Sequence, residues 1–202
     1  MITNNSNQIT LNSGVVVSAK VLRQKDMLAL IPDDKPGWYR WWAPQKALES
    51  LLNSPYISKP YLNELIPHLC SYMREQEYFY IYVGVAINES IRDRLNWHIN
   101  QRHTESAVKS GFLSTLRKTI SSLVAGDQYN ESATNELIDQ LIVEYSAMDL
   151  PIKDPTAKSV ITSIEDIEIQ KHVIPLNIKG NKRSVLKPFL LELKKSRKQS
   201  LC

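Results

Sequence analysis

The strongest constraint on the fold is the run at residues 78–85, which is rich in aromatic and β-branched side chains and predicts a buried strand. The run contains Tyr82-Val83-Gly84, and Asn88 is then a good N-cap for a helix that continues to about Arg102. The aromatic run from Trp38 to Trp42 predicts a second buried strand upstream. Two buried strands, one of them leading directly into a helix, favour a small sheet that is covered by helices.

The other elements follow from the spacing of apolar residues and from turn and capping residues. We expect strands at residues 14–20 and 27–31, and helices at residues 44–52, 61–74, 112–124, 131–145, 163–172 and 184–197. No internal repeat or low-complexity linker interrupts the sequence, which favours one domain over residues 14–202 after a flexible leader at residues 1–13. The expected fold class is α/β (α+β), with a small antiparallel β-sheet flanked by helices. Helical insertions are expected at residues 44–77 and 101–161, followed by a basic C-terminal helix.

Composition argues against several classes of protein. Charged residues make up 23% of the chain, and no window approaches the ~18 apolar residues that a membrane span needs. The first residues lack the basic start and apolar run of a secretory signal, so the cytoplasm is the expected location. Cys70 and Cys202 have no Cys or His neighbour at zinc-finger spacing, which argues against a structural zinc site.

Positive charge is concentrated at the C-terminus. The net charge of the chain is +4, but residues 179–202 contain eight basic residues and only one acidic residue, Glu192. Such a segment attracts polyanions and makes their binding depend on salt. A solvated helix is the alternative explanation for this segment.

Three short motifs lie in a fixed order along the chain. Gly37-Trp38-Tyr39 comes first, Tyr82-Val83-Gly84 ends ten residues before Arg94, and a segment that starts at Glu165 ends in Pro175-Leu176-Asn177. This ordered set resembles the GIY-YIG nuclease family over roughly residues 36–181. The first tripeptide has Trp in place of the family's Ile, and the second is a common variant of the family's motif.

The chain departs from the family pattern in three places. The two tripeptides are far apart, because residues 44–77 insert helices where many members have a short hairpin. The loop between Gly84 and Arg94 is longer than usual, so Arg92 competes for the arginine role, although Arg94 keeps the four-residue spacing to His98. Residues 101–161 are also expanded.

The resemblance implies an active site that cuts a phosphodiester bond with one divalent metal ion, Mg²⁺ or Mn²⁺. Its catalytic residues would be Tyr39, Tyr82, Arg94, His98, Glu165 and Asn177, and Glu165 would also be the metal ligand. Mg²⁺ prefers oxygen ligands and keeps several waters, so one protein carboxylate together with the substrate phosphate can hold it.

Each implied role has a physical basis. The guanidinium of Arg94 offers a fixed fork of donors that matches a phosphate. A phenol has a pKa of about 10 and is a poor base unless its proton is drawn off, whereas an imidazole titrates near neutral pH. The sequence therefore leaves open whether Tyr39 or His98 is the base. Asn177 would brace the active-site loop or contact the substrate backbone. Taken singly, the same residues also suit core tyrosines, a surface arginine, a structural histidine and a first-turn carboxylate.

Five further residues are candidates for substrate binding, namely Gly84, Arg92, Ser114, Arg117 and Lys118. Gly84 has no side chain and permits close approach of the backbone to a phosphate. The last three form a polar, basic patch on the helix expected at residues 112–124, which could hold a nucleic-acid backbone. A solvated helix face is the alternative.

We therefore expect a metal-dependent endonuclease that hydrolyses DNA by in-line attack of water, with a restriction or defence role. One alternative is a non-catalytic nucleic-acid-binding protein on the same fold. Another is the PD-(D/E)xK nuclease core, which Glu192-Leu193-Lys194 mimics, although it lies in a helix-like stretch where that core needs a strand. The expected partner is DNA rather than a membrane. The sequence leaves open the specificity for the nucleic acid, DNA against RNA, and whether the protein forms a homodimer.

Overall fold

The computed structural model describes residues 14–201, so the leader expected at residues 1–13 and Cys202 lie outside the described part of the chain. One antiparallel sheet has the strand order β1-β5-β2-β4-β3. The strands are β1 (Val15–Ser18), β2 (Gly37–Pro44), β3 (Ser71–Met73), β4 (Glu77–Ala86) and β5 (Ile142–Ala147). The α+β class and the antiparallel sheet predicted from the sequence are confirmed.

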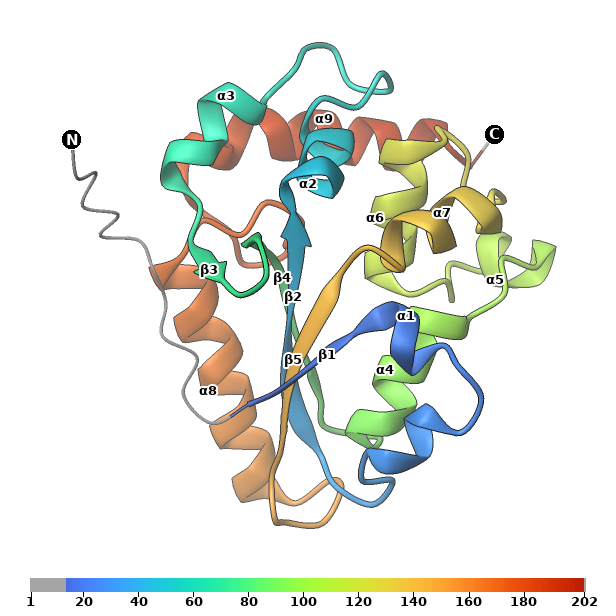
Figure 1. Ribbon diagram of the computed structural model, residues 1–202, viewed down its shortest axis with the longest axis vertical. Coiled ribbons are helices and arrows are strands. Elements are labelled where there is room, and N and C mark those ends of the chain that lie inside the picture. Colours follow the sequence, from blue (N-terminus) through green and yellow to red (C-terminus); the bar gives the residue numbers. More distant parts are fainter. Residues whose placement is uncertain (1–13, 202) are drawn as a thin grey trace.

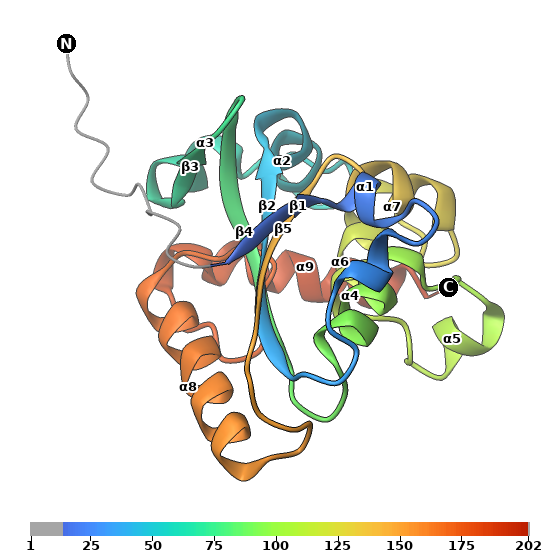
Figure 2. The ribbon, with the colours of Figure 1, turned by 60° about the horizontal axis from the view of Figure 1, so that its bottom comes forward.

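Helices cover both sides of the sheet. The α-helices are α1 (Ala19–Leu22), α2 (Gln45–Leu52), α3 (Leu62–Leu65), α4 (Ile91–Asn100), α5 (Glu105–Lys109), α6 (Thr115–Val124), α7 (Glu131–Ile138), α8 (Pro155–Lys171) and α9 (Lys187–Gln199), and the 3-10 turns are η1 (Met27–Leu30), η2 (Ile66–His68) and η3 (Ser184–Leu186). Figures 1 and 2 show α8 on one side of the sheet, α4 and α6 on the other, and α9 running across one end. No helix in the described part of the chain is long and apolar enough to span a membrane.

Two expected elements differ near the N-terminal half. Residues 27–31 form the turn η1 instead of a strand, because the guanidinium of Arg92 donates hydrogen bonds to the carbonyl oxygens of Ala29 and Ile31 at 2.9 and 2.6 Å. The helix expected at residues 61–74 ends at His68, and Ser71–Met73 then pairs with β4 as strand β3. Pro67 interrupts the helical hydrogen bonding in this region.

The segment expected to be a helix at residues 131–145 is half helix and half strand. Helix α7 ends at Ile138, and the run from Ile142 then pairs with both β1 and β2 as strand β5. Burial between two strands outweighs the helical spacing of its apolar residues. The insertion expected at residues 101–161 is therefore not only helical, because it supplies an inner strand of the sheet.

A β-bulge in β4 decides which side of the sheet each tyrosine faces. Trp41 pairs with Tyr82 and Trp42 pairs with Tyr80, which leaves Ile81 without a partner on β2. A bulge of this kind re-aims the side chains that follow it. As a result Tyr82 packs in the core cluster that contains Tyr39, on the side of α4, whereas Tyr80 packs in the cluster beneath α8. Strict alternation along the strand would have put Tyr82 with Tyr80.

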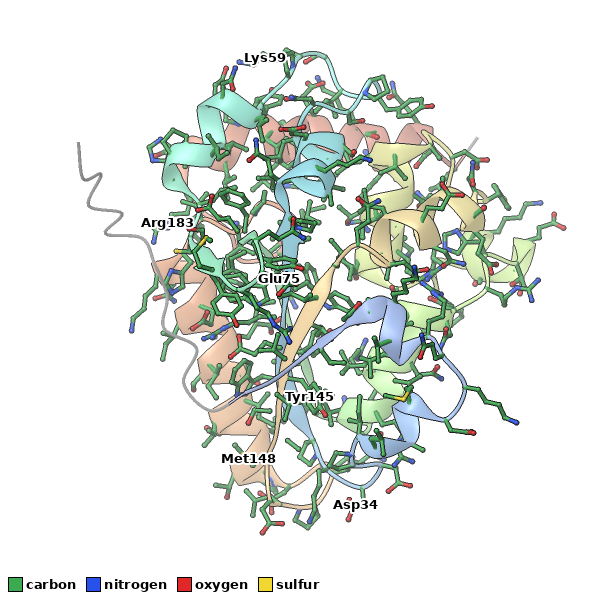
Figure 3. All side chains as sticks on the ribbon, viewed as in Figure 1. Asp34, Lys59, Glu75, Tyr145, Met148 and Arg183 are labelled. Atoms are coloured by element: carbon green, nitrogen blue, oxygen red, sulfur yellow. The ribbon has the colours of Figure 1, made fainter. Side chains whose placement is uncertain are left out.

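The loops at one end of the sheet run together. Asp34 precedes β2 and Met148 follows β5, and Figure 3 shows both at one end of the molecule, with Lys59 at the opposite end. The backbone N–H of Met148 donates to the carbonyl oxygen of Pro36 at 2.8 Å, which continues the pairing of β2 with β5 past the last strand residue.

An ion-pair cluster on the other side of the sheet attaches α8 to the strands. The guanidinium of Arg40 donates to both carboxylate oxygens of Glu168 at 3.1 and 2.8 Å and to Glu144 at 3.2 Å. The hydroxyl of Tyr80 donates to Glu168 at 3.0 Å. The side chains of Arg40, Glu144 and Glu168 are 13%, 0% and 10% exposed, so each charge depends on the others for its compensation.

We expect Arg40→Met to destabilise the protein strongly, because it leaves two carboxylates buried without a cation. Removal of one partner from a buried ion pair costs about 3–5 kcal/mol, and urea unfolding followed by tryptophan fluorescence would measure the loss. Arg74→Met is the matched control, since Arg74 pairs with Glu75 at the surface and should lose less than about 1 kcal/mol. Equal losses in the two variants would contradict this role for the cluster.

Candidate active site

Two phenols and an imidazole pack together on the α4 side of the sheet. Tyr39 on β2 and Tyr82 on β4 have ring centroids 6.5 Å apart. The ring of His98, which projects from α4, lies 5.2 Å from that of Tyr39 and 6.1 Å from that of Tyr82. Their exposed fractions are 2% for Tyr39, 8% for Tyr82 and 1% for His98, so the cluster is almost closed to solvent.

His98 is held between two hydroxyl groups. Its Nε2 lies 2.6 Å from the hydroxyl of Tyr39, and its Nδ1 lies 3.1 Å from the hydroxyl of Ser114. Burial, and then the charges of Arg94 and Arg117, hold the pKa of His98 well below its ordinary value. The imidazole is therefore neutral near pH 7, so one ring nitrogen carries a proton and the other is a hydrogen-bond acceptor.

The two tyrosines are neutral for the same reason. Burial raises the pKa of Tyr39 well above its ordinary value, and the neighbouring Tyr82 adds to the rise. Burial and then the charge of Glu165 raise the pKa of Tyr82 to about 12, while Arg94 and Arg197 oppose the rise. A buried phenol of this kind stays protonated, and it can pass a proton along a series of hydrogen bonds without being ionised beforehand.

Gly84 makes room for Tyr39. The two residues are direct partners across β2 and β4, and the phenol leans over the glycine. A Cβ atom at residue 84 would lie 2.3 Å from the hydroxyl oxygen of Tyr39 and 2.5 Å from its Cζ. The phenol of Tyr39 fills the space over Gly84, so the missing side chain makes room for Tyr39, and close approach of this backbone to a substrate phosphate stays a prediction.

Arg94 lies at the border between this cluster and solvent. Its side chain is 26% exposed, its guanidinium forms an ion pair with Glu89, and its Cζ lies 4.8 Å from the ring centroid of Trp97. The Nε of Arg94 is buried and has no hydrogen-bond partner within the described residues. An arginine with a vacant donor and a stacked plane is prepared to accept an anion such as a phosphate oxygen.

Glu165 belongs to the same electrostatic neighbourhood, although it comes from the other side of the sheet. Helix α8 begins at Pro155, where Asp154 caps it, so Glu165 lies mid-helix and not in a first turn as one alternative had it. Burial and then Asp166 raise the pKa of Glu165, while Lys179 and Arg94 lower it. The charges of both Glu165 and Arg94 act on Tyr39 and Tyr82.

A divalent cation fits the Glu165 carboxylate. Among residues 14–201, no hydrogen bond or ion pair occupies its oxygens, and its raised pKa shows that the surrounding positive charge does not fully compensate it. No group of three or more His, Cys, Asp or Glu residues suited to a metal occurs in the same range. The donor set is thus one carboxylate, which suits a cation that takes its other ligands from water and from phosphate.

Asn177 braces β4 between the two motif residues Tyr82 and Gly84. Its Oδ1 accepts from the backbone N–H of Val83 and its Nδ2 donates to the carbonyl oxygen of the same residue, both at 2.9 Å. The backbone N–H of Leu176 donates to the carbonyl oxygen of Ile81 at 3.0 Å. Strand β3 pairs only with the first residues of β4, so the 176–177 segment completes the edge of β4 beside the bulge.

Three of the candidate substrate-binding residues have structural roles instead. Arg92 donates to carbonyl oxygens in and next to η1, and its Nη1 donates to Asp33 at 2.9 Å. Ser114 is fully buried, caps α6 and bonds to His98. Arg117 is fully buried and donates to His103, to the carbonyl oxygens of His98 and Ile99, and to Asn135. The expected polar patch on this helix is therefore wrong for Ser114 and Arg117, because both face the core, while Lys118 remains partly exposed.

Three residues near the site were missed in the sequence. Glu89 and Trp97 both contact the guanidinium of Arg94. Their positions, just before the helix and three residues after Arg94, are the sequence signal that predicts these contacts. Arg197 acts electrostatically on Tyr82, but in the sequence it counted only toward the basic tail.

One comparison with known proteins gives a match. The family model described as the GIY-YIG catalytic domain matches residues 37–199, which include both tripeptides and the segment from Glu165 to Asn177. No curated protein and no solved structure matches the chain.

The buried pair of His103 and Arg117 makes stability depend on pH. The Nε of Arg117 donates to Nε2 of His103 at 2.8 Å, which requires a neutral imidazole, and burial followed by the charge of Arg117 lowers the pKa of His103 to about 4. The unfolded chain binds this proton near pH 6.5 and the folded chain only near pH 4, so stability should fall as the pH drops through this window.

We expect this single histidine to cost on the order of 3 kcal/mol between pH 7 and pH 4. Urea unfolding at a series of pH values would measure the slope, and His103→Gln should make it shallower. His68→Gln, at an exposed histidine on η2, is the control and should keep the slope of the parent. A His103→Gln protein with the same slope as the parent would contradict the prediction.

Proposed function

The chain belongs to the GIY-YIG family, and on that premise we propose that it is a metal-dependent endonuclease that hydrolyses DNA phosphodiester bonds. The family match upholds the resemblance found in the sequence and implies a nuclease domain with a nucleic-acid substrate. Metal dependence, DNA as the nucleic acid, and the roles of single residues are our proposal.

One observation carries the proposal. Tyr39, Tyr82 and His98 meet on one side of the sheet, and the charges of Arg94 and Glu165 act on both phenols. A proton-accepting group, a phosphate-binding cation and a carboxylate for a metal are the parts that phosphodiester hydrolysis requires.

In the proposed reaction, Tyr39 takes a proton from the attacking water while it gives its own proton to Nε2 of His98. The 2.6 Å contact between the hydroxyl and the imidazole supports this transfer, and neutral His98 is in the correct state to receive the proton. Because the hydroxyl of Tyr39 contacts Nε2 of His98, we give Tyr39 the position between the imidazole and the attacking water. Tyr82 would orient the water or the scissile phosphate.

Arg94 and Glu165 would manage the negative charge. The guanidinium of Arg94, whose side chain is 26% exposed, would bind the scissile phosphate, and such a donor can contribute about 3–4 kcal/mol to the transition state. Glu165 would hold Mg²⁺ or Mn²⁺, which when bound would stabilise charge on the phosphate oxygens. Asn177 would act as a positioning residue, since it fixes the backbone of Val83 between Tyr82 and Gly84.

The proposal extends to the setting of the enzyme. We place it in the cytoplasm, where a buried free thiol such as that of Cys70 stays reduced. The restriction or defence role expected from the sequence remains a prediction, as do the single domain over residues 14–202 and the oligomeric state.

Purified protein should nick or linearise supercoiled plasmid with Mg²⁺ and not with EDTA. Glu165→Ala should abolish cleavage by loss of the metal ligand, and Arg94→Ala should reduce its rate by about 100-fold or more. Agarose gels of time courses with equal protein would measure both. Glu64→Ala and Arg74→Ala, two surface substitutions remote from the site, are the matched controls and should cut like the parent.

Two results would decide against the proposal. Unchanged cleavage by both site variants would mean that the activity comes from another site. A parent that binds DNA but cuts no plasmid with either Mg²⁺ or Mn²⁺ would favour a non-catalytic nucleic-acid-binding protein on this fold.

Gly84→Ala should impair cleavage through Tyr39. The added methyl group would overlap the phenol, move it off His98 and reduce the rate by about 100-fold, similar to Tyr39→Phe. The double variant Gly84→Ala/Tyr39→Phe should lose no more than the worse single variant, because both remove the same proton transfer. Additive losses in a plasmid-cleavage assay would show that Gly84 acts independently of Tyr39. Thermal unfolding of each variant checks that the fold is retained.

A further inference from the structure

A basic pocket lies between α5, α6 and α9, outside the ring cluster of the candidate active site. Its volume is about 410 Å³, and its lining includes five cations and no carboxylate. These residues, named here the basic pocket, are Lys109, Lys118, Lys194, Arg197 and Lys198. Figures 1 and 2 both show the C-terminal end of α9 beside α6, with α5 beyond it.

Arg197 is the cation that most lacks an anion. Its side chain is half-buried, yet no hydrogen bond or ion pair within the described residues engages its guanidinium. Burial lowers its pKa, and its charge adds to the lowering of the pKa of Lys118. By contrast, Arg40 and Arg92 are also partly buried and each has a carboxylate partner. A half-buried guanidinium without such a partner favours an anionic ligand.

The same pocket contains a vacant acceptor. Gln128 is 1% exposed, and its Nε2 donates to the carbonyl oxygen of Arg197 at 2.7 Å and to the hydroxyl of Ser200 at 3.0 Å. These two bonds fix the orientation of the amide, and its Oε1 is left buried without a partner. Lys109 pairs with Glu105, but Lys194, Arg197 and Lys198 have no carboxylate partner among the described residues. A vacant acceptor beside these three cations suits a ligand that carries an anionic group and a hydrogen-bond donor, as a nucleotide unit of DNA does.

The pocket adjoins the candidate active site. Arg197 acts electrostatically on the phenol of Tyr82. Ile178, which lines the pocket, directly follows Asn177, the residue that braces β4. Arg197 and Ile178 thus connect the basic pocket to the part of the candidate site that holds Tyr82 and Asn177.

We propose that the basic pocket binds a non-scissile phosphate of the DNA substrate and so holds the strand while Arg94 engages the scissile phosphate. This inference rests on the proposed function for its substrate. It assigns to Arg197, Lys194 and Lys198 a positioning role, through the backbone of the strand and not through the reacting atoms.

The test measures DNA binding without metal. Fluorescence anisotropy with a fluorescein-labelled 30-bp duplex in EDTA would be recorded at salt concentrations from 50 to 300 mM. Lys194→Ala/Lys198→Ala should bind more weakly, and its plot of log K against log salt should be less steep by about 0.9, since the loss of one phosphate contact removes about that much. Arg197→Gln should also reduce the slope, and Arg197→Lys should restore part of it.

The matched control is Lys187→Ala/Lys195→Ala. It removes the same charge from two exposed lysines of the same helix that do not line the pocket. Its slope should stay close to that of the parent. Equal slopes for the pocket pair and the control pair would overturn the inference, because the effect would then be one of net charge alone. A pocket pair that binds like the parent would overturn it as well, and would leave the pocket to another class of ligand.

Cleavage of plasmid separates this inference from the proposed function. With Mg²⁺ and saturating DNA, the pocket pair should reach the maximal rate of the parent and need more DNA to do so. If the parent does not cut, the nuclease proposal fails while the binding slopes still test the pocket. If the parent cuts and both lysine pairs bind alike, the pocket inference fails alone.

Discussion

The β-bulge in β4 is the constraint on which the candidate site depends. If Ile81 did not lack a partner on β2, Tyr82 would face α8, and Tyr39 and Tyr82 would lie on opposite sides of the sheet. The bulge brings Tyr82 to the side of Tyr39, and Gly84 two residues later lets the ring of Tyr39 cross over the strand. A local irregularity of one residue thus converts an aromatic strand into one wall of a site. The edge of β4 beside the bulge is completed by Asn177, which explains why a residue far along the chain belongs to the same motif set.

Burial sets the chemistry within this site. Tyr39 and His98 are both neutral and linked by one short contact, so a proton can pass between them without either group holding charge beforehand. The charged members, Arg94 and Glu165, lie at the more exposed border, where substrate and solvent can reach them. In the proposed reaction, the buried neutral groups would transfer protons and the partly exposed charged groups would stabilise charge.

Short-range patterns in the sequence predict the two strands that carry the tyrosines of the site. The features that the sequence does not predict depend on contacts between distant parts of the chain. The aromatic runs predicted β2 and β4, and the motif spacing picked out Arg94, Glu165 and Asn177. The apolar spacing around Ile142 fits a helix as well as a strand, so the sequence predicts a helix there. Only the pairing with β1 and β2 makes this segment a strand. Arg117 was placed at the surface because charge is usually exposed, yet four acceptors in the core satisfy it. No sequence pattern predicts the β-bulge, because it depends on the register between β2 and β4.

The Arg40 ion pair has a consequence for the far side of the sheet. Glu168 is three residues after Glu165 on α8, so the two carboxylates belong to one rigid turn of helix. Arg40 and Tyr80 grip the inner carboxylate and thereby fix how far the helix is rotated about its long axis. The direction of the Glu165 carboxylate is therefore set by the contacts of Arg40 and Tyr80 with Glu168. A substitution at position 40 would therefore both destabilise the protein and change the direction of the Glu165 carboxylate.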